Sequence, residues 1–175
     1  MTFDNKFGMF IHWGPYAALG LHEQALARYY IPHEEYENMA MQFNPTGYDP
    51  EKWVILAKKC GMKYICFTAK HHDGFCMWDT KTTDYNIANT PYGKDTLKML
   101  SDACKKHGLL LSLYFSNPDW HYEYGYNPDT SYMGHLDDVA REFYNYIIEV
   151  ASGKKVCSEI AGFHDMAIFK QGVTL

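Results

Sequence analysis

The sequence predicts an α/β fold built on a parallel sheet, because strand-like and helix-like segments alternate along the chain. Candidate strands begin near positions 8, 63, 109 and 156, so successive starts are about 55, 46 and 47 residues apart. This wide spacing, with long loops after the strands, favours a partial (β/α) barrel of about four β/α units over a compact flavodoxin-like sheet. A complete barrel needs roughly 200 to 250 residues, and 175 residues are present.

Uninterrupted or alternating apolar runs mark the strands. The second strand segment is the clearest, because six of its residues (YICFTA) form one apolar run of the kind found in a buried parallel strand. The expected strands cover residues 8–13, 63–69, 109–115 and, with a weaker pattern, 156–163.

Helices are predicted between the strands. Asp49 and Pro50 begin one helix that stops at Gly61, and Asp95 begins another that stops at Gly108. A short helix is expected over residues 32–43. Another should begin near position 137, where apolar residues recur at helical spacing: Val139, Phe143, Tyr146, Ile147 and Val150. Helices in these places imply right-handed crossovers that cover one face of the sheet.

Composition excludes several classes of function. The formal net charge is −5 and the Lys and Arg residues form no stripe, so we expect no nucleic-acid partner. No apolar run approaches the roughly 18 to 20 residues that span a membrane, so we expect no membrane partner. No cofactor is expected. The first residues show no secretory apolar region, so we expect either a cytoplasmic location for the chain as written or a sequence that begins after a removed leader.

Polar and aromatic residues lie at the end of each predicted strand. His12 and Trp13 end the first, His71 and His72 follow the second, and Trp120 lies shortly after the third; the weaker fourth segment is followed by Asp165. Carboxyl ends of parallel strands meet at one edge of a sheet, where ligands bind in such folds. The sequence therefore predicts a pocket there.

Two ligands suit these residue types. Sugar hydroxyls need fixed donors and acceptors, and their C–H faces pack on aromatic rings such as Trp13 and Trp120. A zinc ion would need three or four converging ligands. Adjacent histidines on an extended strand, such as His71 and His72, point to opposite sides, so one ion rarely takes both. We therefore expect no metal, with a metal-dependent hydrolase using His12 and His71 or His72 as the weaker alternative.

Several motifs resemble the α-L-fucosidase family of glycoside hydrolases (family 29). The similarity spans roughly positions 5 to 122. It is carried by residues 7–14 (FGMFIHWG), 64–79 (YICFTAKHHDGFCMWD), 83–86 (TDYN) and 113–116 (LYFS), with Asp119-Trp120. The resemblance implies retaining hydrolysis of terminal α-L-fucose on a TIM-barrel-like domain. The substrate would be a fucosylated glycan or a small α-L-fucoside.

The resemblance also implies site residues. His12, His71 and His72 match histidines that contact fucose, Glu23 matches the glutamate of a Glu-Trp segment, and Tyr114 matches the tyrosine ending the third strand. Family members are often secreted, periplasmic or lysosomal.

The chain departs from the family pattern at Gln24, where many members carry tryptophan, and around Asp165. Asp165 is the candidate nucleophile, although its segment is one residue short and lacks the family's tryptophan. The pattern places the acid/base carboxylate after residue 175. Residues 1–175 are thus expected to be the N-terminal half of a (β/α)8 catalytic domain, without the remaining strands and the C-terminal β-sandwich.

An alternative from a different class is a non-catalytic sugar-binding protein. A half barrel exposes open sheet edges, which another copy of the chain would cover in a homo-oligomer.

Overall fold

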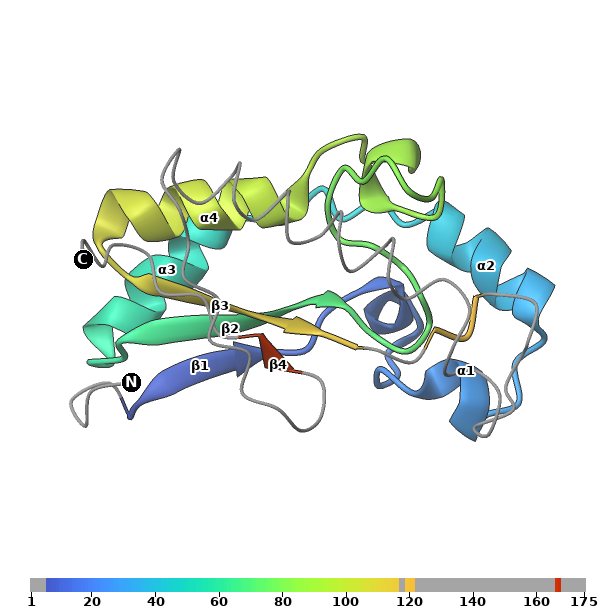
Figure 1. The fold of residues 1–175 in the computed structure, drawn as a ribbon, viewed down its shortest axis with the longest axis horizontal. Helices are drawn as coiled ribbons and strands as arrows, with labels where there is room; N and C mark the ends of the chain where they lie inside the picture. The colour runs from blue at the N-terminus through green and yellow to red at the C-terminus, as the bar shows by residue number, and fades with distance from the viewer. Residues whose placement is uncertain (1–5, 117–118, 122–165, 168–175) are drawn as a thin grey trace.

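The computed structural model describes residues 6–116, 119–121 and 166–167. Its centre is a sheet in the order β1-β2-β3-β4 (Figure 1). Strands β1 (Gly8–Ile11), β2 (Tyr64–Lys70) and β3 (Leu110–Phe115) are parallel, whereas the two-residue β4 (Met166–Ala167) is antiparallel to β3. The chain is thus an α/β protein with three parallel strands in sequence order.

The first three predicted strands are confirmed, each within two residues at its ends. The predicted strand at 156–163 and the predicted helix near 137 lie outside the described residues. Strand β4 was not predicted, because two residues are too few to show a strand pattern.

The three expected helices in the described part are present as α2 (His33–Met41), α3 (Pro50–Lys59) and α4 (Thr96–His107). The predicted caps are confirmed, since Asp49 accepts the backbone N–H of Lys52 at 3.2 Å and Asp95 accepts that of Lys98 at 2.7 Å. Gly108 ends α4 in the left-handed conformation, with φ 67°. No helix in the described ranges has the length and apolar character needed to cross a membrane.

Three shorter elements were not predicted. They are η1 (Pro15–Leu19), α1 (Ala25–Arg28) and η2 (Ile87–Asn89), the first and last being 3-10 helices. Elements of three to five residues are shorter than the windows in which helical periodicity can be seen.

Helices α3 and α4 cover one face of the sheet, as predicted (Figure 1). Apolar side chains from both layers form the main core between them. The helices contribute Val54, Ala57, Leu97, Leu100, Ala103 and Cys104, and the strands contribute Ile65, Phe67, Leu111 and Leu113.

Helices α1 and α2 lie beyond the carboxyl ends of the strands (Figure 1). They are joined to η1 by a second buried cluster of Tyr16, Ala25, Leu26 and Tyr36, against which Trp120 packs. This cluster holds the segment between η1 and α1 close to the edge of the sheet where the predicted site residues emerge.

Candidate functional site

Three aromatic rings meet at the carboxyl edge of the parallel strands. His12 and His71 are the first residues after β1 and β2, and Tyr114 is the last but one residue of β3. The His12 ring centroid lies 5.5 Å from that of His71 and 5.7 Å from that of Tyr114. The rings of His71 and Tyr114 stack at 5.3 Å. The parallel register therefore brings these three predicted site residues together.

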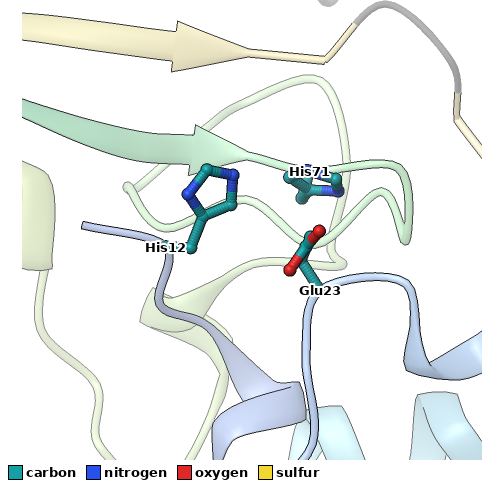
Figure 2. A group of neighbouring side chains, drawn as sticks. All are labelled: His12, Glu23 and His71. Atoms are coloured by element: carbon teal, nitrogen blue, oxygen red, sulfur yellow. The ribbon is translucent and has the colours of Figure 1, made fainter. Parts of the chain in front are cut away.

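Glu23 joins this group from the loop between η1 and α1. A carboxylate oxygen of Glu23 and one ring nitrogen each of His12 and His71 all lie within 4.8 Å of one another. Figure 2 shows the three side chains converging from three separate segments of the chain. His12 is exposed, Glu23 is partly buried and His71 is buried, so the group opens to solvent on the side of His12.

His71 is held in one neutral form. Its Nδ1 atom accepts the backbone N–H of His72 at 2.8 Å, so in the neutral ring the proton is on Nε2. Burial, aided by the nearby His72, His12 and Lys70, lowers the pKa of His71 to about 3. His71 is therefore a neutral hydrogen-bond donor through Nε2 at ordinary pH.

His72 turns toward the β3 side of the site. Its ring lies 4.3 Å from that of His71 and 5.0 Å from that of Trp120, and its Nδ1 shares a hydrogen bond with the Ser116 hydroxyl. The two histidines do not lie on an extended strand as expected, because β2 ends at Lys70 and the chain turns there, but only His71 of the two belongs to the group of possible metal ligands in the described residues. The backbone N–H of Trp120 donates to the carbonyl of His72 at 2.7 Å, which fixes the two loops together.

Trp13 lies apart from this group. Its indole stacks on Tyr48 at 4.8 Å and meets Trp53 and Phe43 at 5.5 Å, within the main core. The sugar-binding role expected of Trp13 stays a prediction, and the contacts favour packing.

A buried charged network beneath the histidines was not predicted. Lys70 is fully buried and pairs with Asp119 at 3.1 Å, while its Nζ also donates to the Ser116 carbonyl at 3.0 Å. Asp73 accepts the Tyr36 hydroxyl at 2.7 Å and the backbone N–H of Phe75 at 3.3 Å. The sequence did contain one signal of this network, namely a lysine at the end of the apolar β2 segment, because a charge in a buried strand needs a partner.

Asp73 also has a displaced pKa. Burial raises its pKa to about 6, although the Tyr36 and Phe75 hydrogen bonds and the Lys70 charge oppose the rise. The sequence suggested that Asp73 and Gly74 form a turn, and Gly74 does adopt the left-handed conformation, with φ 81°.

The segment 119–121 is held by further contacts. The His121 ring stacks on Tyr85 at 4.2 Å, and its Nδ1 lies 2.8 Å from a carboxylate oxygen of Glu37 in α2. Together with the Lys70–Asp119 pair, these contacts fix the position of Trp120 beside His72.

The spacing of His12, Glu23 and His71 would admit a metal ion, but the hydrogen bonding of His71 does not favour one. A ligating nitrogen must present a lone pair, and a ligating histidine usually donates its other N–H to a neighbour. In His71 the arrangement is reversed, because Nδ1 accepts and Nε2 carries the proton. A hydroxyl oxygen suits such a donor better than a cation does.

The donors and acceptors therefore suit a polyhydroxylated ligand. His71 donates, the Glu23 carboxylate accepts, and Tyr114 offers a hydroxyl that does both. Trp120 and Tyr114 add aromatic surface for C–H groups. Asp165, the candidate nucleophile, lies outside the described residues.

The fold and the site define an α/β protein that gathers hydrogen-bonding side chains at the carboxyl ends of its parallel strands. The chain belongs to the alpha-L-fucosidase family, whose model matches residues 2–151. This finding confirms the family resemblance seen in the sequence.

Three proteins illustrate the similarity. Tissue alpha-L-fucosidase of Rattus norvegicus is 31% identical over 134 residues, which are 67% of this chain and 29% of that protein. The crystal structure of alpha-L-fucosidase from Vibrio sp. strain EJY3 has a TM-score of 0.73 at 33% identity, over 83% of this chain and 29% of that one. Alpha-L-fucosidase AlfC from Lactobacillus casei, in complex with alpha-L-fucose product, has a TM-score of 0.65 at 35% identity, over 83% and 52%. The chain spans less than a third of the rat relative's length.

Proposed function

We propose that this protein is an α-L-fucosidase that hydrolyses terminal α-L-fucose with retention of configuration, from a fucosylated glycan or a small α-L-fucoside. The observation that carries the proposal is the convergence of His12, Glu23 and His71 at the strand ends of a chain of this family. The AlfC relative, whose structure holds fucose, supports the choice of sugar.

In this proposal each residue has a role set by its chemistry. His71 donates Nε2–H to a fucose hydroxyl, and Glu23 accepts a proton from an adjacent one. His12 contacts the edge of the sugar that faces solvent, and Tyr114 contacts the edge that faces the sheet. His72 and Trp120 form the wall on the β3 side, where the indole packs on the C–H face or the methyl group of fucose.

We further propose that residues 1–175 form the N-terminal half of a (β/α)8 barrel. The order β1-β2-β3 with parallel pairing and helices on one face is the arrangement that opens such a barrel. The remaining strands and a C-terminal β-sandwich would then belong to the rest of the catalytic protein.

Retaining hydrolysis needs two carboxyl groups about 5 to 5.5 Å apart, one as nucleophile and one as acid/base. We propose Asp165 as the nucleophile. Within the described residues, the carboxylate of Glu23 lies beside His12 and His71. This position suits hydroxyl binding rather than protonation of a leaving group.

Selective sugar binding tests the proposal. Calorimetric titration should show that L-fucose or a fucose-like iminosugar binds more tightly than galactose or glucose. The reason is that a sugar of different configuration leaves buried donors such as His71 Nε2–H unpaired. Equal affinities for a folded chain would contradict the assignment.

A second candidate function is sugar binding without catalysis. Glu23 lies beside His12 and His71, where it suits hydroxyl binding, and this observation favours the candidate. Two results together would select this alternative. Fucose should bind tightly whether or not Asp165→Asn is present, and neither the 175-residue chain nor any longer product of the gene should hydrolyse a fucoside.

For the non-catalytic alternative, in which no further strands complete the sheet, we also propose that a second copy of the chain covers the open edge at β1. Strand β1 is one edge of the sheet in the described residues. An open edge strand presents unpaired backbone groups and is a site for pairing with another chain. Size-exclusion chromatography with light scattering should show a dimer, and a monomer would contradict this proposal.

A further inference from the structure

The two neighbouring histidines of the site are held at Nδ1 by different groups. In His71 this atom accepts a backbone N–H, that of His72, at 2.8 Å. In His72 it is hydrogen bonded to the hydroxyl of Ser116, the first residue after β3. A backbone group cannot be removed by substitution, whereas a serine hydroxyl can, so the contribution of this bond to the site can be measured.

Ser116 is itself fixed in place by Lys70, the last residue of β2. Its backbone N–H donates to the Lys70 carbonyl at 3.0 Å, and its carbonyl accepts the Lys70 Nζ, also at 3.0 Å. The serine is fully buried, and the lysine ammonium is anchored in turn by Asp119 at 3.1 Å. The Ser116 hydroxyl is therefore presented to His72 from a backbone that two hydrogen bonds and an ion pair hold in place.

The other side of His72 is bonded to the same network. Its carbonyl accepts the backbone N–H of Trp120 at 2.7 Å, and Trp120 directly follows Asp119, the partner of Lys70. The rings of His72 and Trp120 lie 5.0 Å apart. Lys70 thus connects both loops, and the Ser116 hydroxyl extends the network to the imidazole itself.

The chemistry of imidazole gives this bond a consequence for a ligand. A neutral ring carries one N–H and one lone pair, and the partner of one nitrogen decides which of the two the other nitrogen presents. If the serine hydroxyl donates to Nδ1, His72 presents Nε2–H to the site, and if it accepts, His72 presents a lone pair. In both cases the bond selects one tautomer and stops the ring from turning, so a sugar hydroxyl meets a single, fixed partner.

We propose that Ser116 is a positioning residue for the sugar site, whose hydroxyl fixes His72 in one tautomer and one orientation. The consequence for sugar binding rests on the proposed function, because it concerns the same site. The fixed tautomer does not, because it is a property of the ring in the absence of a ligand.

Ser112 supplies a matched comparison on the same strand. It lies four residues before Ser116, is 5% exposed and pairs in register with Cys66 of β2. Replacing either serine with alanine removes one buried hydroxyl from the same region of the sheet. A purely structural hydroxyl would lower stability in both cases, whereas the proposal expects only the Ser116 substitution to change His72.

Nitrogen NMR of the histidine rings in the 175-residue chain tests the proposal without a ligand. Long-range nitrogen–proton correlation spectra distinguish a ring nitrogen that carries the proton from one that carries the lone pair, and the spectrum of His72→Gln identifies the signals of His72. At mildly basic pH the parent chain should show one neutral tautomer of His72. Ser116→Ala should shift both ring nitrogens toward the values of a ring that averages its tautomers, and Ser112→Ala should leave them unchanged.

Titration with L-fucose by calorimetry gives the second readout. Ser116→Ala should weaken binding by about 3- to 10-fold, the equivalent of one hydrogen bond, and Ser112→Ala should leave the affinity unchanged. Averaged tautomers of His72 in the parent chain, or the same single tautomer in Ser116→Ala, would overturn the inference whatever the sugar affinities are. So would an undiminished affinity of Ser116→Ala for L-fucose. If the parent chain does not bind L-fucose, the proposed function fails, whereas a tautomer that is lost with the hydroxyl still shows that Ser116 fixes the ring.

Discussion

The Nδ1 atom of His71 accepts the backbone N–H of His72 at 2.8 Å, which makes His71 a donor toward the site. Two residues further on, buried Asp73 accepts the Tyr36 hydroxyl at 2.7 Å. Burial lowers the pKa of His71 to about 3 and raises that of Asp73 to about 6. Both groups are therefore neutral at mildly acidic pH. Their effects on the pH dependence of stability are opposite in sign: acidification weakens the contribution of His71 and strengthens that of Asp73.

His71→Gln should remove an acid-sensitive contribution to stability. An unfolded histidine takes up a proton near pH 6.5, whereas folded His71 stays neutral to about pH 3. Between these values the unfolded state binds more protons, so this residue makes the free energy of unfolding fall on acidification by up to about 1.4 kcal/mol per pH unit. Urea unfolding at pH 4 to 6 should therefore show the variant gaining stability relative to the parent as pH falls.

Asp73→Asn should produce the opposite change. The folded carboxyl is protonated below about pH 6, whereas the unfolded one is ionised down to 3.8. Its contribution to stability is thus present at low pH and is lost as pH rises through about 6. The variant should lose stability relative to the parent on acidification from pH 6 to 4, by a similar amount. Parallel pH slopes for Asp73→Asn, His71→Gln and the parent chain would refute the two burial effects.

Asp119→Asn should destabilise the protein by several kcal/mol. It would leave Lys70, whose side chain is 1% exposed, without its charge partner, and breaking a buried pair costs about 3 to 5 kcal/mol. Denaturant unfolding measures the loss. Lys98→Met is the matched control, because its pair with Asp102 is 56% and 55% exposed and should contribute roughly 0.5 kcal/mol or less. Comparable losses in the two variants would mean that the Lys70–Asp119 pair is not structural.

Gly74→Ala should separate the two loops that carry His72 and Trp120. A Cβ on Gly74 would overlap Asp119 Oδ1, and the Gly74 backbone has φ 81°. We expect a loss beyond the roughly 1 kcal/mol of left-handed strain, together with weaker fucose binding. Gly108→Ala has φ 67° and open space around the added carbon, so it should show the strain alone. Equal losses in thermal unfolding would contradict the close packing at Gly74.

The strands and long helices could be predicted because their signals are local. Asp49 and Asp95 cap helices by bonding to residues three positions away, and an apolar run marks a buried strand wherever it lies. The short α1 could not be predicted, since its four residues are held by contacts with Tyr16 and Tyr36. Such contacts join positions distant in the sequence, and no local pattern records them.

The site also has features that the sequence could predict and features that it could not. The parallel sheet was enough to bring His12, His71 and Tyr114 together, because strand ends share an edge. The tautomer of His71 and the pairing of Lys70 with Asp119 depend on atoms at single positions, and the sequence contains no signal for their geometry. Trp13 shows the limit of an argument from position in sequence, since it follows a strand but packs among core aromatics.

The 175-residue chain should hydrolyse an aryl α-L-fucoside very poorly. Retaining hydrolysis requires an acid/base in addition to a nucleophile, and general acid–base catalysis contributes about 10²- to 10⁴-fold. The family resemblance places that carboxylate after residue 175. An aryl leaving group needs little protonation, so any residual turnover should pass through Asp165 and be abolished by Asp165→Asn. Release of the phenol, followed by absorbance, measures this turnover.

Robust turnover that Asp165→Asn abolishes would mean that the chain is a complete catalyst. Turnover that survives Asp165→Asn but disappears with a chelator would instead favour a metal at His12, Glu23 and His71, the geometry that the hydrogen bond at His71 Nδ1 opposes.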